Sequence, residues 1–168
     1  MRTLVIMRHA KAEPAAATDH ERELTRRGHA DAAAAGAWVA GRGIRPDVAL
    51  VSGAGRTRQT WEDVAIGAGW DLDLAAFDEA LYTASTEAAI DLLRETDDAV
   101  GSLVVIGHNP TVSYLVQLLD DGEGDLEAGN RLALGFPTSA VAVLSYDGRW
   151  ADLGAGSASV VAFHAPQG

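Results

Sequence analysis

The 168-residue sequence contains no cysteine, a single lysine and no long apolar segment. Without cysteine the chain can form neither disulfides nor thiolate metal sites, and it suits a reducing compartment. No apolar stretch approaches the roughly 18–20 residues that a membrane-spanning helix needs. The first apolar segment also begins almost at Met1, which leaves no space for a signal peptide. We therefore expect a soluble cytoplasmic protein with no membrane partner.

Positive charge is also scarce, because 13 lysine and arginine residues face 24 aspartates and glutamates, for a formal net charge of −11. A nucleic-acid-binding protein needs clustered positive charge to neutralise phosphates, so this balance argues against a nucleic-acid partner. The chain shows no internal repeat, linker or low-complexity tract. Its length is typical of one domain with its own hydrophobic core, and we expect a single domain over residues 1–168.

Short apolar runs at 3–7, 48–51 and 103–106 are each predicted to form a strand. Each run is continuous rather than alternating, which is typical of a parallel sheet covered on both faces. A weaker run at 72–77 alternates with aspartates and is predicted to be an edge strand. The sequence therefore predicts a central sheet that is mostly parallel.

Helical patterns separate these runs. Residues 25–39 are expected to form a helix, followed by one around Trp61, one over 86–96, and one that opens at Asn109 with Pro110 in the first helical position. The buried stripe of the first helix is predicted to consist of Ala30, Ala33, Ala34, Ala37 and Trp38. Alternation of strand and helix favours helices on both faces of the sheet.

The last part of the chain, from residue 120 onward, is predicted to contain a loop, a hairpin and a final strand. Residues 120–137 are acidic and rich in glycine, so a surface loop that could gate a crevice is expected. Segments 140–146 and 150–153 flank Asp147-Gly148, a strong hairpin signal, and 160–163 is predicted as a last strand. The predicted fold class is α/β: a single three-layer αβα domain, with a mostly parallel central sheet and an antiparallel edge.

Polar side chains follow each of the three main apolar runs. Arg8-His9 ends the first, Ser52 to Arg56 follows the second, and Gly107-His108-Asn109 follows the third. The carboxyl ends of parallel strands meet at one edge of a sheet, where ligands bind. Two arginines and two histidines are therefore expected to converge on one crevice.

This combination favours an oxyanion of high charge density. Arginines beside the histidines would repel a metal cation. The glycine pattern of a dinucleotide-binding loop is incomplete, and the sequence lacks a P-loop and a Gly-x-Ser-x-Gly elbow. Phosphoryl transfer, in contrast, needs an in-line nucleophile and stabilisation of the equatorial oxygens. A histidine nucleophile beside a guanidinium meets both needs.

These motifs resemble those of the histidine phosphatase (phosphoglycerate mutase-like) superfamily. Arg8-His9-Ala10 is similar to its Arg-His-Gly signature, and Ser52 to Thr60 matches Ser-x-x-x-Arg-x-x-Gln-Thr. Gly107-His108-Asn109-Pro110 resembles the third motif. The short chain and the segment Glu21 to Gly28, with Arg-x-Leu-Thr-x-x-Gly, are similar to the SixA-type phosphohistidine phosphatase branch. The resemblance extends to the run at 135–140 and so spans most of the chain.

The resemblance implies a role for each matching residue and requires no cofactor and no metal. His9 would be the nucleophile that carries the phosphoryl group. Arg8 and Arg56 would bind the phosphate oxygens, His108 would donate to the same group, and Arg22 would add a further contact. Inorganic phosphate would be the product, and the branch's activity would place the protein in signal transduction. Asn109 is interpreted as a helix cap, Gln59 and Thr60 as support, and the remaining histidines as surface residues.

The substrate depends on the proton donor, because alkoxide leaving groups need a general acid. Glu79 is the nearest candidate and Asp78 the alternative, but their flanking sequence does not match the mutase acid motif closely. Without an acid, a phosphohistidine on a partner protein is the favoured substrate, since imidazole departs with little help. The alternatives are a small-molecule phosphomonoesterase that uses Glu79 and, more distantly, a non-catalytic phosphate-binding module. A mutase is disfavoured because elements for rebinding a sugar phosphate are not evident.

Overall fold

The computed structural model describes residues 1–167 and contains one six-stranded sheet with the order β3-β2-β4-β1-β5-β6. Strands β1 to β4 run parallel to one another, whereas β5 is antiparallel to β1 and β6 is antiparallel to β5. The strands are β1 (Arg2–Arg8), β2 (Val48–Ser52), β3 (Ala75–Asp78), β4 (Ser102–Gly107), β5 (Val141–Tyr146) and β6 (Ala158–His164). The predicted fold class is confirmed, and β3 is the edge strand expected near residues 72–77.

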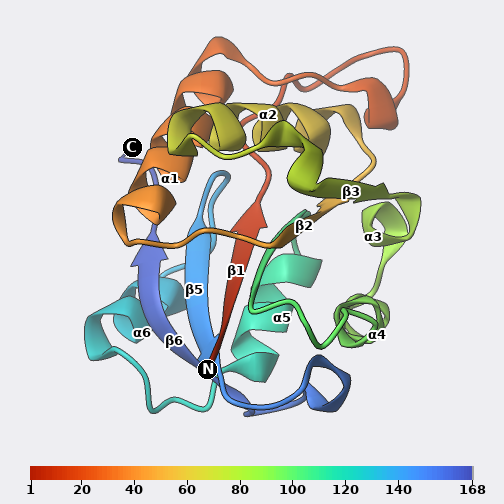
Figure 1. Ribbon diagram of the computed structural model, residues 1–168. Helices are drawn as coiled ribbons and strands as arrows, with labels where there is room; N and C mark the ends of the chain where they lie inside the picture. Colours follow the sequence, from red (N-terminus) through yellow and green to blue (C-terminus); the bar gives the residue numbers. More distant parts are fainter. Residues whose placement is uncertain (168) are drawn as a thin grey trace.

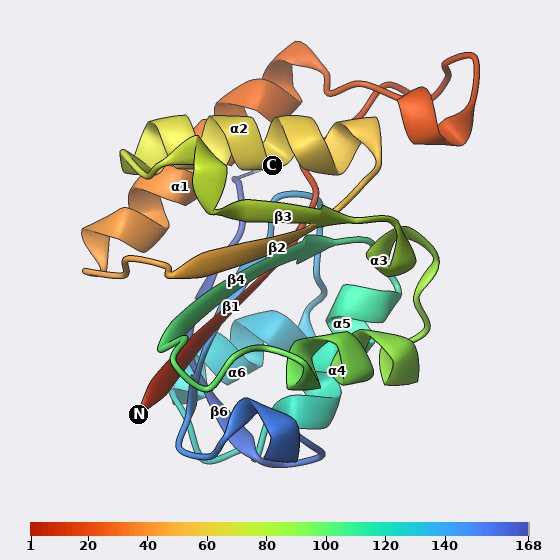
Figure 2. The ribbon, with the colours of Figure 1, turned by 45° about the vertical axis from the view of Figure 1, so that its right-hand side comes forward.

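Helices cover both faces of this sheet, as Figures 1 and 2 show. Helices α1 and α2 lie together on one face, and α4, α5 and α6 lie on the other (Figure 2). The helices are α1 (Arg26–Gly41), α2 (Gly55–Ala68), α3 (Glu79–Thr83), α4 (Thr86–Arg94), α5 (Thr111–Leu119) and α6 (Leu126–Ala133). Among the helices of residues 1–167, none is both long and apolar enough to cross a membrane.

Burial of β1 on both faces of the sheet explains why its sequence is apolar without alternation. Leu4 and Ile6 pack into the core on the α4–α5 side, while Val5 and Met7 pack into the core under α1 and α2. All four side chains are buried. Because successive residues of a strand point to opposite faces, a strand between two helical layers needs an apolar residue at every position.

The predicted stripe of α1 is wrong. Ala30, Ala34 and Ala37 are exposed, and the residues of α1 that are buried are Gly28, Ala32, Ala35, Gly36 and Val39. The reason is close packing of two helix backbones. A Cβ atom at Gly36 would lie 2.1 Å from the carbonyl oxygen of Val64 in α2, so only glycine fits there. In an alanine-rich helix, size rather than hydrophobicity selects the face that meets a neighbouring backbone.

The expectation of a loop over 120–137 is also wrong, since α6 occupies most of its second half. The Asp125 carboxylate accepts a hydrogen bond from the Ala128 amide and caps the helix. Glu127 lies in the first turn, where the helix dipole favours negative charge. Ala128 and Leu132 bury one side of the helix. The acidic composition thus belongs partly to a helix start rather than to a gating loop.

The predicted hairpin pairs the wrong segments. Residues Trp150–Asp152 form a short 3-10 turn, and the antiparallel partner of β5 is β6, with a bulge near Val143 and Leu144. Trp150 is fully buried, and its indole Nε1 donates to the Val100 carbonyl at 2.8 Å. A buried, hydrogen-bonded tryptophan anchors this segment against the core, so it does not continue as a strand.

Candidate active site

The carboxyl ends of β1 to β4 form one edge of the sheet, as predicted. Arg8 pairs with Gly107 across β1 and β4, and Ser52 pairs with Asp78 across β2 and β3. This register brings the rings of His9 and His108 to a centroid distance of 5.4 Å. Two residues that are 99 positions apart in sequence therefore face one another because their strands are neighbours.

His9 is held in one orientation. Its Nδ1 lies 2.7 Å from the carbonyl oxygen of Ala10, and its side chain is largely buried. A carbonyl oxygen only accepts hydrogen bonds, so Nδ1 carries the proton and Nε2 of the neutral ring keeps its lone pair. The Ala10 amide in turn donates to Thr60 Oγ1 at 3.0 Å. The unprotonated Nε2 of His9 is thus fixed by local backbone geometry.

Both histidines are neutral at pH 7. The pKa of His9 is lowered to about 4, mainly by burial and in addition by the positive charges of Arg56, Arg8 and Arg22, against the opposing effect of the Ala10 hydrogen bond. Burial lowers the pKa of His108 to about 3, followed by the charge of Arg56. A neutral imidazole is the reactive form of a histidine nucleophile.

His108 is positioned by Ser52. Its Nε2 lies 2.7 Å from Ser52 Oγ, and Ser52 is completely buried at the end of β2. Within residues 1–167, the Nδ1 atom of His108 is buried and makes no hydrogen bond. The sequence motif contained Ser52 but gave no indication that its hydroxyl orients the second histidine.

The two arginines lie on either side of this pair. Arg8 donates from Nη1 to the Phe136 carbonyl at 3.2 Å, and Arg56 donates to the carbonyl and the carboxylate of Asp19 at 2.9 and 3.2 Å. Arg56 is only 6% exposed. In the part of the chain that the structure describes, the Nε atoms of both arginines are buried and make no hydrogen bond. Buried guanidinium groups are well suited to bind the oxygens of a phosphoryl group.

Asp19 is the residue that sequence reasoning missed. It accepts hydrogen bonds from Tyr82 Oη at 2.5 Å and from Arg22 Nη1 at 3.0 Å, in addition to those from Arg56. The Tyr82 hydroxyl and then Arg22 hold the pKa of Asp19 well below its usual range. Asp19 therefore joins two predicted arginines into one group. A single aspartate in a polar loop gives no local signal of this role.

The segment Glu21 to Gly28 fastens the loop that carries Asp19 and Arg22. The Leu24 amide donates to Gln59 Oε1 at 2.7 Å, and Thr25 accepts from the Gly28 amide at 2.9 Å as the N-cap of α1. A Cβ atom at Gly28 would lie 2.1 Å from the Lys11 carbonyl oxygen. The Leu-Thr-x-x-Gly pattern is thus explained by the contacts that anchor this loop to α1 and α2. Gln59 supports the loop, as the sequence analysis expected.

The two candidate proton donors are engaged elsewhere. Asp78 Oδ1 accepts a hydrogen bond from the Ala80 amide at 2.8 Å and caps α3. The carboxylate oxygens of Glu79 lie 2.9 and 3.2 Å from Nε2 of His20, and the Glu79 side chain is 63% exposed. Glu79 is therefore at the exposed mouth of the crevice, paired with His20, which the sequence analysis interpreted as a surface histidine.

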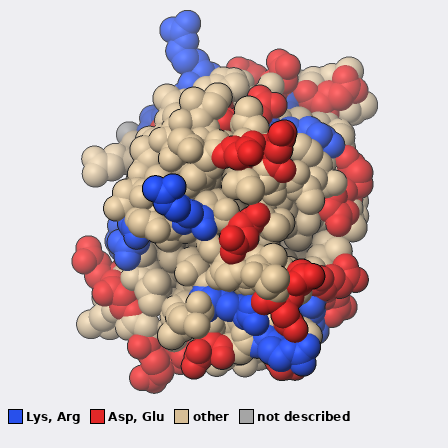
Figure 3. All heavy atoms as spheres, viewed as in Figure 1, with Lys and Arg blue, Asp and Glu red and all other residues tan. Residues whose placement is uncertain are grey.

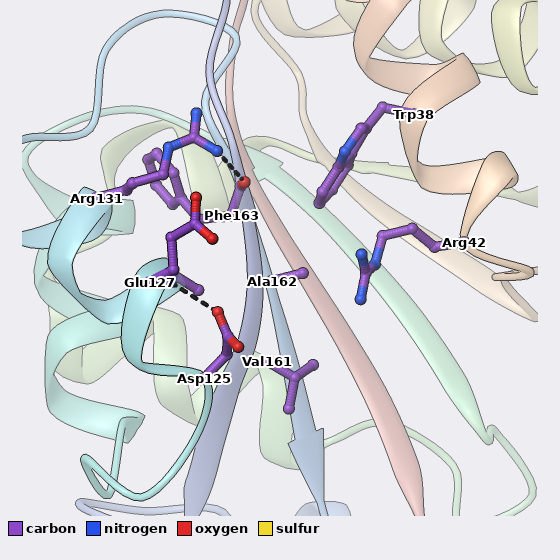
Figure 4. A pocket seen from close by; sticks show the side chains of 9 residues that line it. Trp38, Arg42, Asp125, Glu127, Arg131, Val161, Ala162 and Phe163 are labelled. Atoms are coloured by element: carbon purple, nitrogen blue, oxygen red, sulfur yellow. Dashed lines mark hydrogen bonds between the residues drawn. The ribbon is translucent and has the colours of Figure 1, made fainter.

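A separate cavity lies at the other side of the sheet, beside the edge strand β6 (Figure 4). It measures about 300 Å³ and is lined mainly by the far end of α1, by α6 and by β6. Arg131 from α6 reaches the Phe163 carbonyl at 3.0 Å, and the Asp125 amide donates to the Val160 carbonyl. These contacts occupy outer backbone groups of β6, so this region protects an exposed sheet edge.

The neutral histidines are expected to affect stability at acid pH. Their folded-state pKa values of about 4 and 3 lie below the ordinary 6.5, so the unfolded chain binds more protons between these limits. The free energy of unfolding should therefore fall as the pH is lowered from 7 to 5, by about 2 kcal/mol for each histidine. Urea unfolding at the two pH values measures this. His108→Gln should remove about half of the decrease, and an unchanged decrease would contradict the assignment.

The carboxyl edge of this parallel sheet holds two neutral histidines and two largely buried arginines, which are groups suited to bind a phosphoryl group. A family model described as histidine phosphatase superfamily (branch 1) matches residues 4–81 of this sequence. Together with the relatives described next, this match shows that the chain belongs to the histidine phosphatase superfamily. Membership of this superfamily supports a phosphatase activity.

Related sequences and a related solved structure are similar to this chain over most of its length. The uncharacterized protein Rv1276c of Mycobacterium tuberculosis (strain H37Rv) is 39% identical and aligns over 96% of this chain and 100% of its own. The phosphohistidine phosphatase SixA of Escherichia coli K12 is 33% identical over 84% of each chain. A structure from Nakamurella multipartitia, provisionally assigned as a phosphohistidine phosphatase SixA, is 33% identical, covers 98% of this chain and 96% of its own, and superposes with a TM-score of 0.84.

Proposed function

We propose that this protein hydrolyses phosphohistidine on a partner protein through a covalent intermediate on His9. Nε2 of His9 attacks phosphorus, the bond from phosphorus to the substrate imidazole breaks, and its electron pair returns to that ring. Water then attacks the phosphoryl-His9 intermediate, releases inorganic phosphate and restores the lone pair of Nε2. The Ala10 carbonyl supports this role because it keeps Nε2 as the unprotonated nitrogen.

The surrounding cations would stabilise the transferred group. Arg8 and Arg56 approach from β1 and α2, and both are at least half buried, so their charges act in an environment with little water. His108 would donate to the same oxygens from β4. Arg22 is close enough to lower the pKa of His9, which supports a further contact with the phosphoryl group.

The exposure and hydrogen bonds of Glu79 and Asp78 are the observations that favour a phosphohistidine over an alkyl phosphate as the substrate. A general acid for an alkoxide is usually a carboxyl group kept neutral by apolar burial. Glu79 is mostly exposed and accepts from His20, and Asp78 caps a helix. Neither carboxyl group is buried. A phosphohistidine does not need a buried carboxylic acid, because imidazole is a better leaving group than an alkoxide.

Charge also fits a protein substrate better than nucleic acid. The face drawn in Figure 3 carries basic side chains scattered among acidic ones. With a net charge of −11, long-range attraction toward polyanions is unfavourable. A phosphohistidine-bearing carrier in the cytoplasm would place the enzyme in phosphohistidine signal transduction.

The proposed function is tested by comparing substrates on one enzyme. Phosphate release at neutral pH would be followed with a phosphohistidine-bearing carrier protein and with a panel of alkyl and sugar phosphates. We expect kcat/KM for the phosphoprotein to exceed that for every alkyl phosphate by at least about 10²-fold, which is the lower range of a general acid's contribution. His9→Ala is the blank. If an alkyl phosphate is preferred, the protein is a small-molecule phosphomonoesterase and Glu79 or Asp78 regains the role of acid.

A further inference from the structure

His20 lies at the mouth of the crevice in contact with two groups that fix its orientation. Its Nε2 is within hydrogen-bonding distance of both Glu79 carboxylate oxygens, at 2.9 and 3.2 Å. Its ring stands edge-on to the Tyr82 ring at a centroid distance of 5.0 Å. The Tyr82 hydroxyl is bound to Asp19, the residue before His20. The imidazole is therefore positioned from both sides although its side chain is 40% exposed.

This position is adjacent to the phosphoryl-binding groups. Arg56 Nη1 donates to the Asp19 carbonyl, one peptide unit from His20, at 2.9 Å. The Tyr82 ring that contacts His20 also lies 5.4 Å from the His108 ring, and His108 lies 5.4 Å from His9. Four aromatic rings thus lead in series from the nucleophile to the mouth. A leaving group that extends along this series of rings would lie beside His20.

Glu79 also determines which nitrogen of His20 is available. An ionised carboxylate only accepts hydrogen bonds, so Nε2 carries a proton and Nδ1 is the atom free to exchange one. Gly53 makes space for this pair, since a Cβ atom there would lie 1.9 Å from Glu79 Oε1. The arrangement of carboxylate, imidazole and reacting group is that of a carboxylate-oriented acid–base histidine.

We propose that His20, oriented by Glu79, is the proton donor and acceptor for the leaving group. This inference rests on the proposed phosphatase reaction and deepens it. As the P–N bond of the substrate breaks, Nδ1–H of His20 gives its proton to the distal nitrogen of the departing imidazole, which leaves as a neutral ring. In the second step Nδ1 takes a proton from the attacking water, while the P–Nε2 bond of His9 breaks and its electron pair returns to His9.

The chemistry of this transfer suits the substrate. Donor and acceptor are both imidazole rings, so the proton moves between two groups of the same chemical type. Glu79 is not the acid in this scheme. Its carboxylate oxygens accept the hydrogen bond from His20 Nε2 and so fix the orientation of the ring.

His20→Asn tests the assignment, because asparagine keeps a donor for Glu79 but cannot exchange a proton. The parameter kcat/KM reports the step in which the leaving group departs. We expect it to fall by about 10²–10⁴-fold with a phosphohistidine peptide. With p-nitrophenyl phosphate, whose phenolate leaves without a proton, the loss should be at least about 10-fold smaller. Glu79→Gln should show the same selectivity with a smaller loss.

The chain offers a matched control in His29→Asn. His29 Nδ1 pairs with Asp63 at 2.6 Å between α1 and α2, so this variant removes a similarly exposed histidine that is also paired with a carboxylate. It should leave both substrates unaffected. Parallel losses with the two substrates in His20→Asn would indicate a structural or phosphate-binding role and overturn the proposal. A larger loss in Glu79→Gln than in His20→Asn would make Glu79 the donor and also overturn it.

Failure of the proposed substrate can be separated from failure of this assignment. If the wild-type enzyme does not hydrolyse the phosphohistidine peptide, phenyl phosphate replaces it as the substrate whose leaving group needs a proton. A selective loss on phenyl over p-nitrophenyl phosphate then still supports His20. Equal losses on the two esters would refute it.

Discussion

His9→Ala is expected to abolish turnover and the covalent intermediate together. The wild-type enzyme, quenched during turnover of a radiolabelled substrate, should carry a phosphoryl group that is labile to acid and stable to base, as a phosphohistidine is. Nε2 of His9 is unprotonated, and the Ala10 carbonyl fixes its ring near the two arginines. Loss of the nucleophile removes the whole covalent route, so kcat should fall by about 10⁴-fold or more.

The variant must be shown to fold, because His9 is buried and its backbone is hydrogen-bonded to β4 and to the segment before β5. Its amide donates to the Gly107 carbonyl and its carbonyl accepts from the Ser139 amide. These bonds involve main-chain atoms, so they survive the substitution. A retained urea midpoint at pH 7, together with His29→Ala as a histidine control, separates chemistry from folding. An adduct of the same stability in His9→Ala would refute the assignment of the nucleophile.

Arg56→Ala should give the second largest effect. Arg56 is nearly inaccessible, lies in the first turn of α2 and is tied to Asp19 by its two terminal nitrogens. A charge in that setting stabilises the transition state strongly, and its loss should lower kcat/KM by about 10²–10³-fold, or roughly 2.7–4 kcal/mol. The His9 adduct should still form, but slowly, in single-turnover measurements.

Two further variants refine this prediction. Arg56→Lys keeps the charge but loses the planar fork, so it should recover only part of the activity. Arg27→Ala, which removes an arginine paired with Asp31 on the surface of α1, should leave kcat/KM unchanged. If Arg56→Ala matched Arg27→Ala, the phosphoryl group would have to be bound by other residues.

The strand ends were predictable because they depend on local pattern and one topological rule. Continuous apolar runs identify buried parallel strands, and the carboxyl ends of such strands share an edge. His9 and His108 therefore could be placed together without coordinates. The face of α1 could not, since nearly all of its residues are small and the contact with Val64 in α2 selects glycine rather than hydrophobicity.

The segments that were misassigned depend on distant partners. Trp150 lies in a turn because its indole reaches Val100, and β6 pairs with β5 across a bulge that no local rule indicates. The acidic residues before α6 resemble those of a loop until Asp125 is seen to cap the helix. In each case a long-range or capping contact outweighs local composition.

The sequence by itself determined the class of fold, and it placed two histidines and two arginines at one edge of the sheet, because those residues follow directly from strand ends in a fixed order. Only the tertiary structure decided how they are oriented. Ala10 selects the reactive nitrogen of His9, and Asp19 and Glu79 act on residues far from them in sequence, Arg56 and His20. Hydrogen bonds between separate loops depend on where the loops meet, and local sequence does not contain that distance.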